Sequence, residues 1–470
     1  MSKQLPRTIS AWQLMNFLRP GSSSSSTTTT PTPDITSELH LTKTRRMPSI
    51  IRPDQILIKV KAASLNPVDS LLIYGYGSSS FNLLRRFTSP CGCFGVPNIE
   101  NTMTSENNSG FPFTPGRDFA GEIVDIGPEV KSSNRTNNIK ISIGTNVAGA
   151  TWPFLSSTGS GALAEYIICP AEYVAPLPKN VSYLHAAALG YAGLTAWSAL
   201  VDTGGIRPVR QRMSQTTRTP SQLLSNNLIL ITGATGGVGF IAAQLAKLWG
   251  WRVHVTCPGD DKALALMKSL EVEEVFPYPT KIPNTLKYDL ILDCIRPEYI
   301  NTATPFSPSS SSPSSSASST SSSSSTNKQS SNTLLNNILP YIPPTLSYLN
   351  TSSNQSRYIM LNPSLLHLTD YWGPFLGTGL AFTQLISTKL AATFSVKAGD
   401  SITSLNNCNI IRWAFFKPNR KALQAMLTLL SNGELIIPID TVYNFMDVPK
   451  AFNRLYAKGV RGKLVIEMNK

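Results

Sequence analysis

The amino-acid sequence predicts an α/β protein that joins a β-rich domain to a doubly wound parallel sheet. Three observations carry this prediction. Segments that alternate apolar and polar residues dominate the first part of the chain, strand and helix patterns alternate from about residue 186 to 415, and the glycine-rich stretch ITGATGGVG lies at 231–239. Alternating strands and helices are typical of parallel sheets with right-handed crossovers.

The β-rich part is predicted from QILIKVKAASL (55–65), DFAGEIVDIG (118–127) and ALAEYIICP (162–170), which have the period of strands and are broken by Gly and Pro. In the second part, five apolar runs predict buried strands: LILITG (228–233), WRVHVTC (251–257), EEVFPY (273–278), YDLILDC (288–294) and RYIML (357–361). FIAAQLAKLW and KALALMKSL predict the helices between the first three. A helix, KALQAMLTLLSNGEL, and a strand, GKLVIEM, are predicted for the tail.

These patterns predict three regions. The β-rich domain occupies 1–190, the domain with the doubly wound sheet occupies 191–415, and the chain returns to the first domain over 416–470. The low-complexity Ser-rich insert at 303–333 is too polar to bury a core, so we predict disorder there. Smaller polar inserts lie at 21–33, 89–110 and 207–226.

Charge and cysteine content exclude some classes of protein. The formal charge of +14 is high, but no Lys/Arg cluster is interleaved with aromatic residues, so we expect solvated surface charge and no DNA ligand. The six cysteines lack paired CxxC spacing, and no secretory signal is present, which favours a reducing compartment. The uncharged stretch 186–201 is shorter than the ~20 residues of a spanning helix, and we interpret it as buried helix in a soluble protein.

The glycine cluster at 231–239 predicts a phosphate site, because it joins an apolar strand to an amphipathic helix. Residues without side chains let the backbone approach a pyrophosphate, and the helix N-terminus offers free N–H groups. A plain strand-to-helix turn is the alternative. The residues expected to bind the cofactor here are Thr235, Gly236, Gly237 and Val238.

NADPH is the predicted form of the cofactor. A domain that prefers NAD usually has an acid at the tip of the second strand, whereas this strand ends in Cys257 and Pro258, with Asp260 and Asp261 slightly later. Lys262 would bind the 2′-phosphate as a point charge, or is an ordinary helix-surface lysine.

Five stretches resemble the medium-chain dehydrogenase/reductase superfamily, and within it the zinc-free quinone oxidoreductases. They are ASLNPVDSLLIYGYG, PFTPGRDFAGEIVDIG, AAALGYAGLTAWSAL, ITGATGGVGFIAAQLAKLWG and RGKLVIEM. GYG (75–77), TPGRD (114–118), LTAWSA (194–199) and RWAFF (412–416) are similar to the narrower group of reticulon-interacting mitochondrial oxidoreductases.

The resemblance implies a GroES-like catalytic domain with a Rossmann domain, and NADPH-dependent reduction of a quinone or enone linked to ubiquinone biosynthesis. It also implies a mitochondrial location and a reticulon-type membrane-protein partner, and it leaves a homodimer open. AWQL (11–14) matches the first strand of the resembled group, so about ten residues precede it, fewer than a usual transit segment has. A cytoplasmic location therefore stays as the alternative.

At the reacting end, the resemblance points to Asn66, Tyr74 and Tyr76 as catalytic residues, with Asp69 and Thr195 as further candidates, Thr195 on the cofactor. Asn66 would orient a substrate carbonyl, and a tyrosine hydroxyl would stabilise a developing phenolate. The alternative for Asn66 is simple turn chemistry.

The zinc alcohol dehydrogenases of the superfamily have Gly-His-Glu where this chain has Gly116, Arg117 and Asp118. Arginine stays protonated and cannot bind zinc, so we expect no metal and no alcohol oxidation. We interpret Arg117 and Asp118 as a structural ion pair.

The resemblance places Tyr278 against the adenosine part of the cofactor, with a core aromatic as the alternative. It brings the turn of Gly459, Val460 and Arg461 close to the cofactor phosphate, with a surface turn as the alternative. We expect RWAFF to pack at the domain interface near the nicotinamide.

One segment departs from the resembled family. Cys294, Arg296 and Pro297 in LILDCIRP replace small residues that pass close to the cofactor. Together with the charge of +14, this departure motivates the competing hypothesis of a non-enzymatic RNA-, membrane- or protein-binding adaptor that keeps the reductase fold.

Overall fold

The computed structural model describes residues 5–18, 35–78, 80, 111–133, 141–152, 161–208, 227–278, 281–295, 343–350, 353, 355–361, 369, 374–397, 410–457 and 459–468. The inserts predicted at 21–33, 89–110 and 303–333, and Arg296 and Pro297, lie outside these residues.

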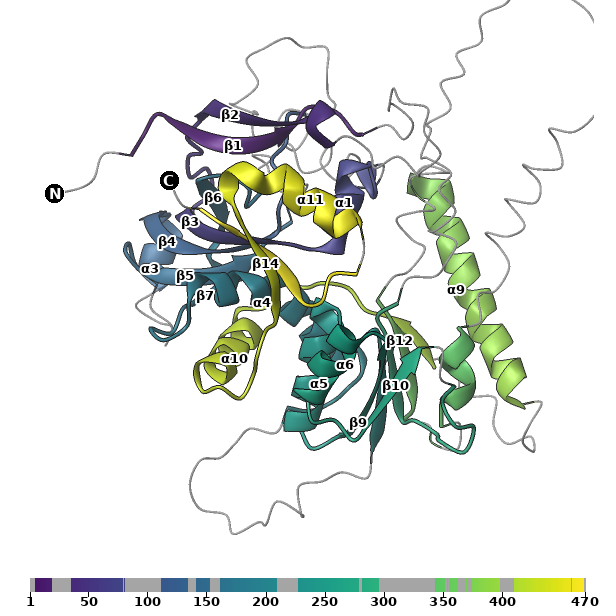
Figure 1. Ribbon diagram of the computed structural model, residues 1–470. Helices are drawn as coiled ribbons and strands as arrows, with labels where there is room; N and C mark the ends of the chain where they lie inside the picture. The colour runs from purple at the N-terminus through teal and green to yellow at the C-terminus, as the bar shows by residue number, and fades with distance from the viewer. Residues whose placement is uncertain are drawn as a thin grey trace, which may run out of the picture.

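A six-stranded parallel sheet forms the nucleotide-binding half of the protein (Figure 1). Its order is β10-β9-β8-β11-β12-β13, and every neighbouring pair is parallel. The strands are β8 (Leu228–Thr232), β9 (Arg252–Pro258), β10 (Glu274–Tyr278), β11 (Leu290–Asp293), β12 (Arg357–Met360) and β13 (Ile411–Trp413). The chain starts at β8, moves outward to β10, and then crosses to β11. This reversal places a topological switch point beside β8, where ligands of such sheets bind.

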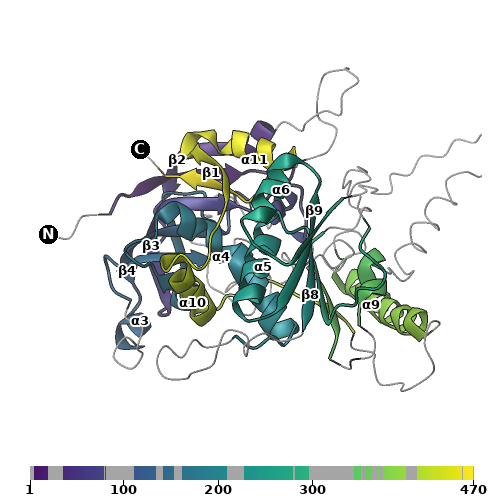
Figure 2. The same ribbon diagram turned by 60° about the horizontal axis from the view of Figure 1, so that its bottom comes forward.

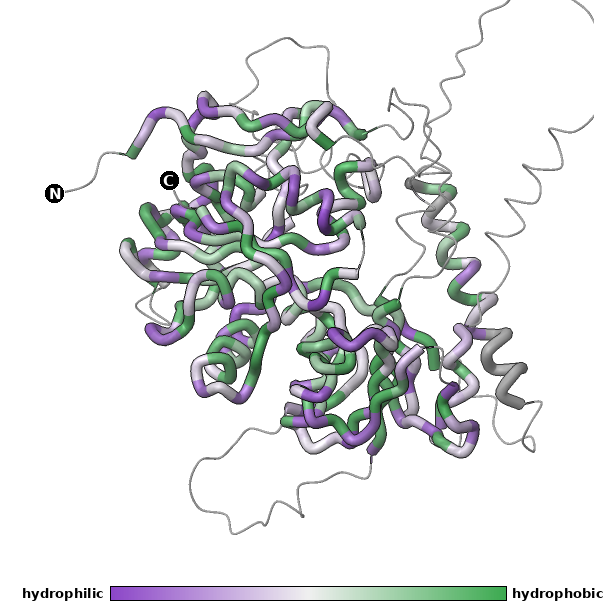
Figure 3. Tube along the Cα trace, in the orientation of Figure 1, coloured by the Kyte–Doolittle hydropathy of each residue, from purple (hydrophilic) through white to green (hydrophobic). Residues whose placement is uncertain are grey.

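Helices cover both faces of this sheet. Figures 1 and 2 show α5 (Gly237–Leu248) and α6 (Asp261–Lys268) on one face and α9 (Pro374–Lys397) on the other. All five residues of β8 are buried, as expected for a central parallel strand that is covered on both sides. Figure 3 shows hydrophobic colouring along the strands of this sheet. The predicted doubly wound sheet is therefore confirmed.

A second, mostly antiparallel sheet of seven strands forms the β-rich half. Its strands are β3 (Gln55–Leu65), β4 (Asp118–Ile126), β5 (Asn146–Ala150), β6 (Tyr166–Pro170), β7 (Val174–Pro176), β14 (Ile439–Asn444) and β15 (Lys463–Glu467). The last strand, β15, pairs with β3, so the end of the described chain completes the sheet that its first part begins. A hairpin of β1 (Thr8–Leu14) and β2 (Leu39–Arg46) lies over this half (Figure 1).

Helix α4 (Tyr183–Trp197), extended by a π-helical turn (Ser198–Thr203), joins the two halves. It packs on β3, β4 and β5 on one side and on α5 on the other. Among the described residues, Tyr183–Thr203 has the length and apolarity of a membrane span, but 72% of its apolar window is buried inside the protein. The interpretation of this stretch as buried helix is confirmed.

Several elements are not predicted by the sequence patterns. They include the short strands β5, β7 and β13, the strands β2 and β14, and the helix α9. Strand β13 begins one residue before RWAFF, so part of that motif is the edge strand of the parallel sheet. The remaining helices are α1 (Pro67–Ile73), α3 (Pro128–Ser133), α10 (Arg420–Ser431) and α11 (Val448–Tyr456).

We predict that Gly239→Ala in α5 destabilises the protein by about 1–3 kcal/mol. A Cβ at this position would lie 2.7 Å from the Gly233 carbonyl oxygen and 2.9 Å from the Ala234 Cα, both of them backbone atoms. Gly379→Ala in α9 is the matched control, because a Cβ there meets no atom of the described part of the chain within 4 Å, and we expect a gain of about 0.4–1 kcal/mol. Denaturant unfolding of both variants measures the difference. Equal effects would contradict close packing of α5 on the glycine turn.

Candidate functional site

The glycine turn lies where β8 ends and α5 begins. Gly233 has a φ of +67°, a left-handed conformation that favours glycine. Gly236 is the N-cap of α5, and no side chain caps this helix end. Among the described residues, a Cβ at Gly236 would meet only the Gly233 carbonyl oxygen, at 3.4 Å. The uncapped N–H groups and the open space above Gly236 fit a pyrophosphate.

Beside this turn, Thr256 near the end of β9 connects two strands. Its hydroxyl contacts the Tyr278 hydroxyl at 2.8 Å and accepts a hydrogen bond from the Gly233 N–H at 3.3 Å. Tyr278 is 42% exposed, so the alternative of a core aromatic is wrong for it. Pro258 ends β9 and Lys262 is exposed in the first turn of α6, so both lie at the same edge of the sheet as the glycine turn.

The turn before β15 reaches the glycine turn from the other half of the protein. The Gly462 N–H donates to the Thr235 carbonyl at 3.1 Å, and Gly236 and Gly462 form an isolated parallel β-bridge. Arg461 Nη2 donates to Asp260 Oδ2 at 2.6 Å. Gly459 is exposed with a φ of +69°, and Val460 is half-buried against the β-rich core.

The contacts of Asp260 in this region were not predicted from the sequence. It is the N-cap of α6, where its carboxylate accepts the Ala263 N–H at 3.0 Å as well as the bond from Arg461. The hydrogen bond from Arg461 holds the pKa of this carboxyl below its usual value. Asp260 thus follows the tip of β9, and its carboxylate is paired with the guanidinium of Arg461. The Asp-x-x-Ala spacing at a helix start is the signal that could have found the cap.

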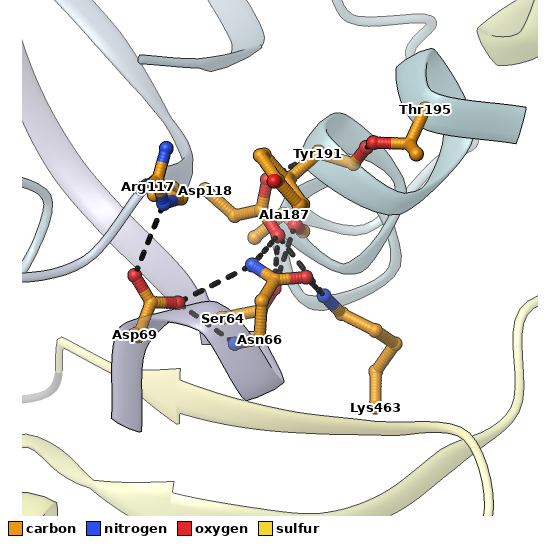
Figure 4. Close-up of polar contacts among 9 residues, drawn as sticks. All are labelled: Ser64, Asn66, Asp69, Arg117, Asp118, Ala187, Tyr191, Thr195 and Lys463. Atoms are coloured by element: carbon orange, nitrogen blue, oxygen red, sulfur yellow. Dashed lines mark hydrogen bonds and ion pairs between the residues drawn. The ribbon is translucent and has the colours of Figure 1, made fainter. Parts of the chain in front are cut away.

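At the other end of the site, Asn66 is the N-cap of α1 and is 3% exposed (Figure 4). Its Nδ2 donates to Asp118 Oδ2 at 2.9 Å and lies 3.4 Å from Asp69 Oδ2. Its Oδ1 accepts from Lys463 Nζ at 2.5 Å. The amide is thus engaged within the protein on both its nitrogen and its oxygen.

Asp118 is the hub of these contacts. Its Oδ2 accepts from Ser64 Oγ at 2.8 Å and from Lys463 Nζ at 3.0 Å, and its Oδ1 accepts from the Tyr191 N–H. Asp118 and Lys463 are 0% and 3% exposed. A charge buried this deeply requires such partners, because it has lost its hydration. Lys463 was not predicted; its signal is a lysine that begins the apolar strand KLVIE.

The predicted ion pair between Arg117 and Asp118 is wrong. Arg117 Nε instead lies 3.6 Å from Asp69 Oδ1, while Asp118 pairs with Lys463. Adjacent residues in extended chain point to opposite faces, so the two side chains turn toward different partners. The Arg117 guanidinium, 1% exposed, lies over the rings of Trp152 and Tyr191, 5.0 and 5.1 Å from their centroids.

The two phenylalanines of the RWAFF motif differ in their burial. Phe416 is buried and stacks on Tyr191 with ring centroids 4.6 Å apart, whereas Phe415 is 44% exposed. Trp152 also contacts Phe416 edge-on at 5.0 Å. RWAFF thus joins the parallel sheet through β13 and the aromatic surroundings of Arg117 through Phe416.

The two predicted catalytic tyrosines follow α1 at its far end. Asn66 precedes the helix and Tyr74 is its C-cap, so about 10 Å of helix separates them. The Tyr74 hydroxyl is buried and has no hydrogen-bond partner among the described residues, and burial raises its pKa. The Tyr76 N–H donates to the Leu71 carbonyl. Thr195 is buried in α4 and donates its hydroxyl to the Tyr191 carbonyl at 2.7 Å.

The fourth strand of the parallel sheet also borders the glycine turn. Asp293 at the end of β11 accepts from the Thr232 hydroxyl at 2.7 Å, and the Cys294 N–H donates to that hydroxyl. A Cβ on Gly233 would meet Ile295 at 3.2 Å, and Ile295 is 41% exposed. Cys294, the described residue of the departure from the resembled family, therefore lies beside the turn.

Two family models match the chain. The alcohol dehydrogenase GroES-like domain matches residues 52–179, and the zinc-binding dehydrogenase family matches residues 382–466. With the two-sheet architecture and the glycine turn, these matches make the chain similar to the medium-chain dehydrogenase/reductase superfamily in both its β-rich part and its closing part.

Individual proteins with similar sequences or structures are also found. The chain is 26% identical to the mitochondrial NAD(P)H oxidoreductase RTN4IP1 of Danio rerio, over 92% of this chain and 88% of that protein. It is 32% identical to a chloroplast envelope quinone oxidoreductase homolog of Arabidopsis thaliana, over 52% of this chain and 60% of that one. The quinone oxidoreductase structure from Coxiella burnetii shares the fold, with a TM-score of 0.58 and 20% identity, covering 98% of this chain and all of that chain.

Zinc, which the name of one matching family implies, does not fit the residues of this site. The amide of Asn66 and the guanidinium of Arg117 are unsuitable ligands, because zinc takes thiolate, imidazole and carboxylate donors. Within the described ranges, no three His, Cys, Asp or Glu side chains gather as a metal site requires.

We predict that Asp69 makes the protein less stable as the pH rises from about 4 to 6. Burial raises the pKa of this carboxyl from 3.8 to about 6, although Arg117 opposes the shift. The folded state then holds the proton more tightly than the unfolded chain. The associated stability is complete below pH 3.8 and is lost as the pH rises through 6, on the order of 2–3 kcal/mol.

Denaturant unfolding of the natural protein and of Asp69→Asn at several pH values measures this contribution. The free energy of unfolding of Asp69→Asn should lack the fall between pH 4 and 6, because the amide does not titrate. Parallel stability curves for the two proteins from pH 4 to 7 would show that Asp69 ionises normally.

Proposed function

We propose that this chain is a zinc-independent, NADPH-dependent oxidoreductase that transfers hydride to a quinone or enone. The observation that carries the proposal is the open, uncapped N-terminus of α5 at Gly236, with Arg461 held beside it. The superfamily supports a redox reaction, and several relatives are named as NAD(P)H or quinone oxidoreductases.

The chain's own residues would hold the cofactor in three places. The backbone N–H groups of Gly237 and Val238 would bind the pyrophosphate at the α5 N-terminus. Arg461 and Lys262 would bind the 2′-phosphate, Arg461 through its planar fork and Lys262 as a point charge. Tyr278, exposed beside the glycine turn, would lie against the adenosine. The cofactor, when bound, supplies the hydride.

The reacting end offers hydrogen bonding without a metal. The Tyr74 hydroxyl is buried and unpartnered among the described residues, so it is a donor for an oxygen that becomes negative as hydride arrives. Tyr76 follows on the same turn. The amide of Asn66 already binds Asp118 and Lys463. We propose that it positions the site instead of contacting the substrate.

The names of the relatives support a proposal for the cellular setting. The Danio rerio and human relatives are both named as mitochondrial, and the human one is 25% identical over 92% of this chain. We extend the proposal to a mitochondrial location, with ubiquinone biosynthesis as the pathway that provides the quinone and a reticulon-type membrane protein as a partner.

The deciding experiment is titration of the purified protein with NADPH and NADH, followed by cofactor oxidation with a small quinone. Preferential NADPH binding with turnover supports the proposal. Binding without turnover would move the search to other acceptors. A protein that binds neither dinucleotide, but binds RNA or anionic lipid at physiological salt, would be the adaptor instead.

We predict that Arg461 and Asp260 set the preference for NADPH in opposite directions. Arg461→Ala should raise the Kd for NADPH about tenfold and change that for NADH little, because a charge-assisted bond to the 2′-phosphate is lost. Asp260→Asn keeps a good N-cap but removes a negative charge beside the phosphate, so NADPH should bind more tightly. Lys421→Met, on the exposed face of α10, is the control.

Fluorescence or calorimetric titration of each variant with both dinucleotides checks this prediction. Equal losses of NADPH and NADH affinity in Arg461→Ala would indicate that Arg461 supports the fold of the turn and does not contact a 2′-phosphate.

A further inference from the structure

Three consecutive residues tie the two halves of the protein together at the glycine turn. Arg461 pairs with Asp260, and the Gly462 N–H donates to the Thr235 carbonyl. Lys463 then turns the other way, toward the buried amide and carboxylate of the β-rich half. Arg461 and Gly462 thus contact the dinucleotide-binding half, and the ammonium of Lys463 contacts the reacting end.

The stem of Lys463 contacts the glycine turn as well. A Cβ on Gly237, the first residue of α5, would lie 3.0 Å from Lys463 Cδ and 3.7 Å from its Cγ. The methylene groups therefore pack over the backbone that faces the proposed pyrophosphate site. One side chain thus contacts the turn through its stem and Asn66 through its head.

The head of Lys463 fixes the orientation of Asn66. An ammonium is a donor only, so the amide oxygen must face it, and the amide nitrogen is then directed to Asp118. Reversing the amide would place an N–H against the ammonium and an oxygen against the carboxylate. The same amide nitrogen lies 3.4 Å from Asp69 Oδ2 in the first turn of α1, so the orientation of Asn66 bears on the helix that leads to Tyr74.

We propose that Lys463 is a positioning residue that couples occupancy of the glycine turn to the conformation of Asn66 and α1. The inference rests on the proposed function in placing the dinucleotide at the turn. The methylene groups of Lys463 contact the glycine turn, and its ammonium contacts Asn66 at the start of α1. A change in the position of the turn therefore changes the position of Asn66 and α1. Binding at one half of the protein thereby orders the reacting end in the other half.

Two substitutions separate the stem from the head. Lys463→Met keeps most of the apolar stem and removes the ammonium, so NADPH should bind within about threefold of the natural affinity. Its kcat should fall about tenfold to a hundredfold, because Asn66 and α1 lose their register. Lys463→Ala removes both parts, so NADPH affinity should fall together with kcat. Lys421→Met controls for the loss of a lysine charge.

A second measurement does not depend on turnover. Amide hydrogen exchange, read by mass spectrometry, follows the peptides that cover 66–73 and 233–239. Without cofactor, Lys463→Met should exchange faster at 66–73 only, whereas Lys463→Ala should exchange faster in both peptides. Added NADPH should protect both peptides in the natural protein and only 233–239 in Lys463→Met.

The outcomes distinguish the two proposals. If the natural protein does not bind NADPH, the proposed function fails, and exchange without cofactor still tests the contacts of Lys463. If Lys463→Met is less stable but exchanges normally at 66–73 and keeps its kcat, Lys463 is only structural and the inference is overturned.

If Lys463→Met does not fold, Lys463→Arg replaces it. The larger planar head of arginine keeps the charge but cannot occupy the same place between Asn66 and Asp118. A fall in kcat of about tenfold with unchanged NADPH affinity is then expected. A natural kcat in that variant would contradict the inference.

Discussion

The buried carboxylate of Asp118 is the contact on which the β-rich half and the helix that joins the two halves converge. It accepts hydrogen bonds from β3, from the start of α1, from the helix that joins the halves, and from the last strand of the chain. A charge with no exposure is stable only while these donors stay in place. The position of α4 on the β-rich sheet and the geometry around Asn66 therefore depend on the same set of bonds.

The buried charges of the site form two ion pairs that differ in how well their carboxylates are hydrogen-bonded. Two acids, Asp69 and Asp118, are matched by Arg117 and Lys463, and each cation takes one acid. The pairs are unequal. Asp118 is fully hydrogen-bonded, whereas Asp69 Oδ1 has no hydrogen-bond partner among the described residues and lies 3.6 Å from the guanidinium. Burial therefore raises the pKa of Asp69 and makes it the titrating member of the set.

Aromatic rings surround the guanidinium of Arg117 and contact it in place of water. Trp152 and Tyr191 present their faces to it, and Phe416 packs against both rings. Arginine is suited to this place, because its planar, weakly hydrated head stacks on aromatic faces. A site of this kind holds a fixed positive charge near the reacting end without a metal ion.

The sequence by itself determined the two-sheet architecture and the glycine turn, because apolar periodicity and glycine spacing are local properties of the chain. The resemblance to a known family added the prediction that Tyr278 and Arg461 lie in one region with Gly236. Only the tertiary structure decided the partners of the charged residues. Arg117 pairs with Asp69 rather than its neighbour, and Lys463 reaches Asn66 from 397 residues away in the chain. Such pairing depends on which faces the packed strands present, and spacing along the chain carries no information about it.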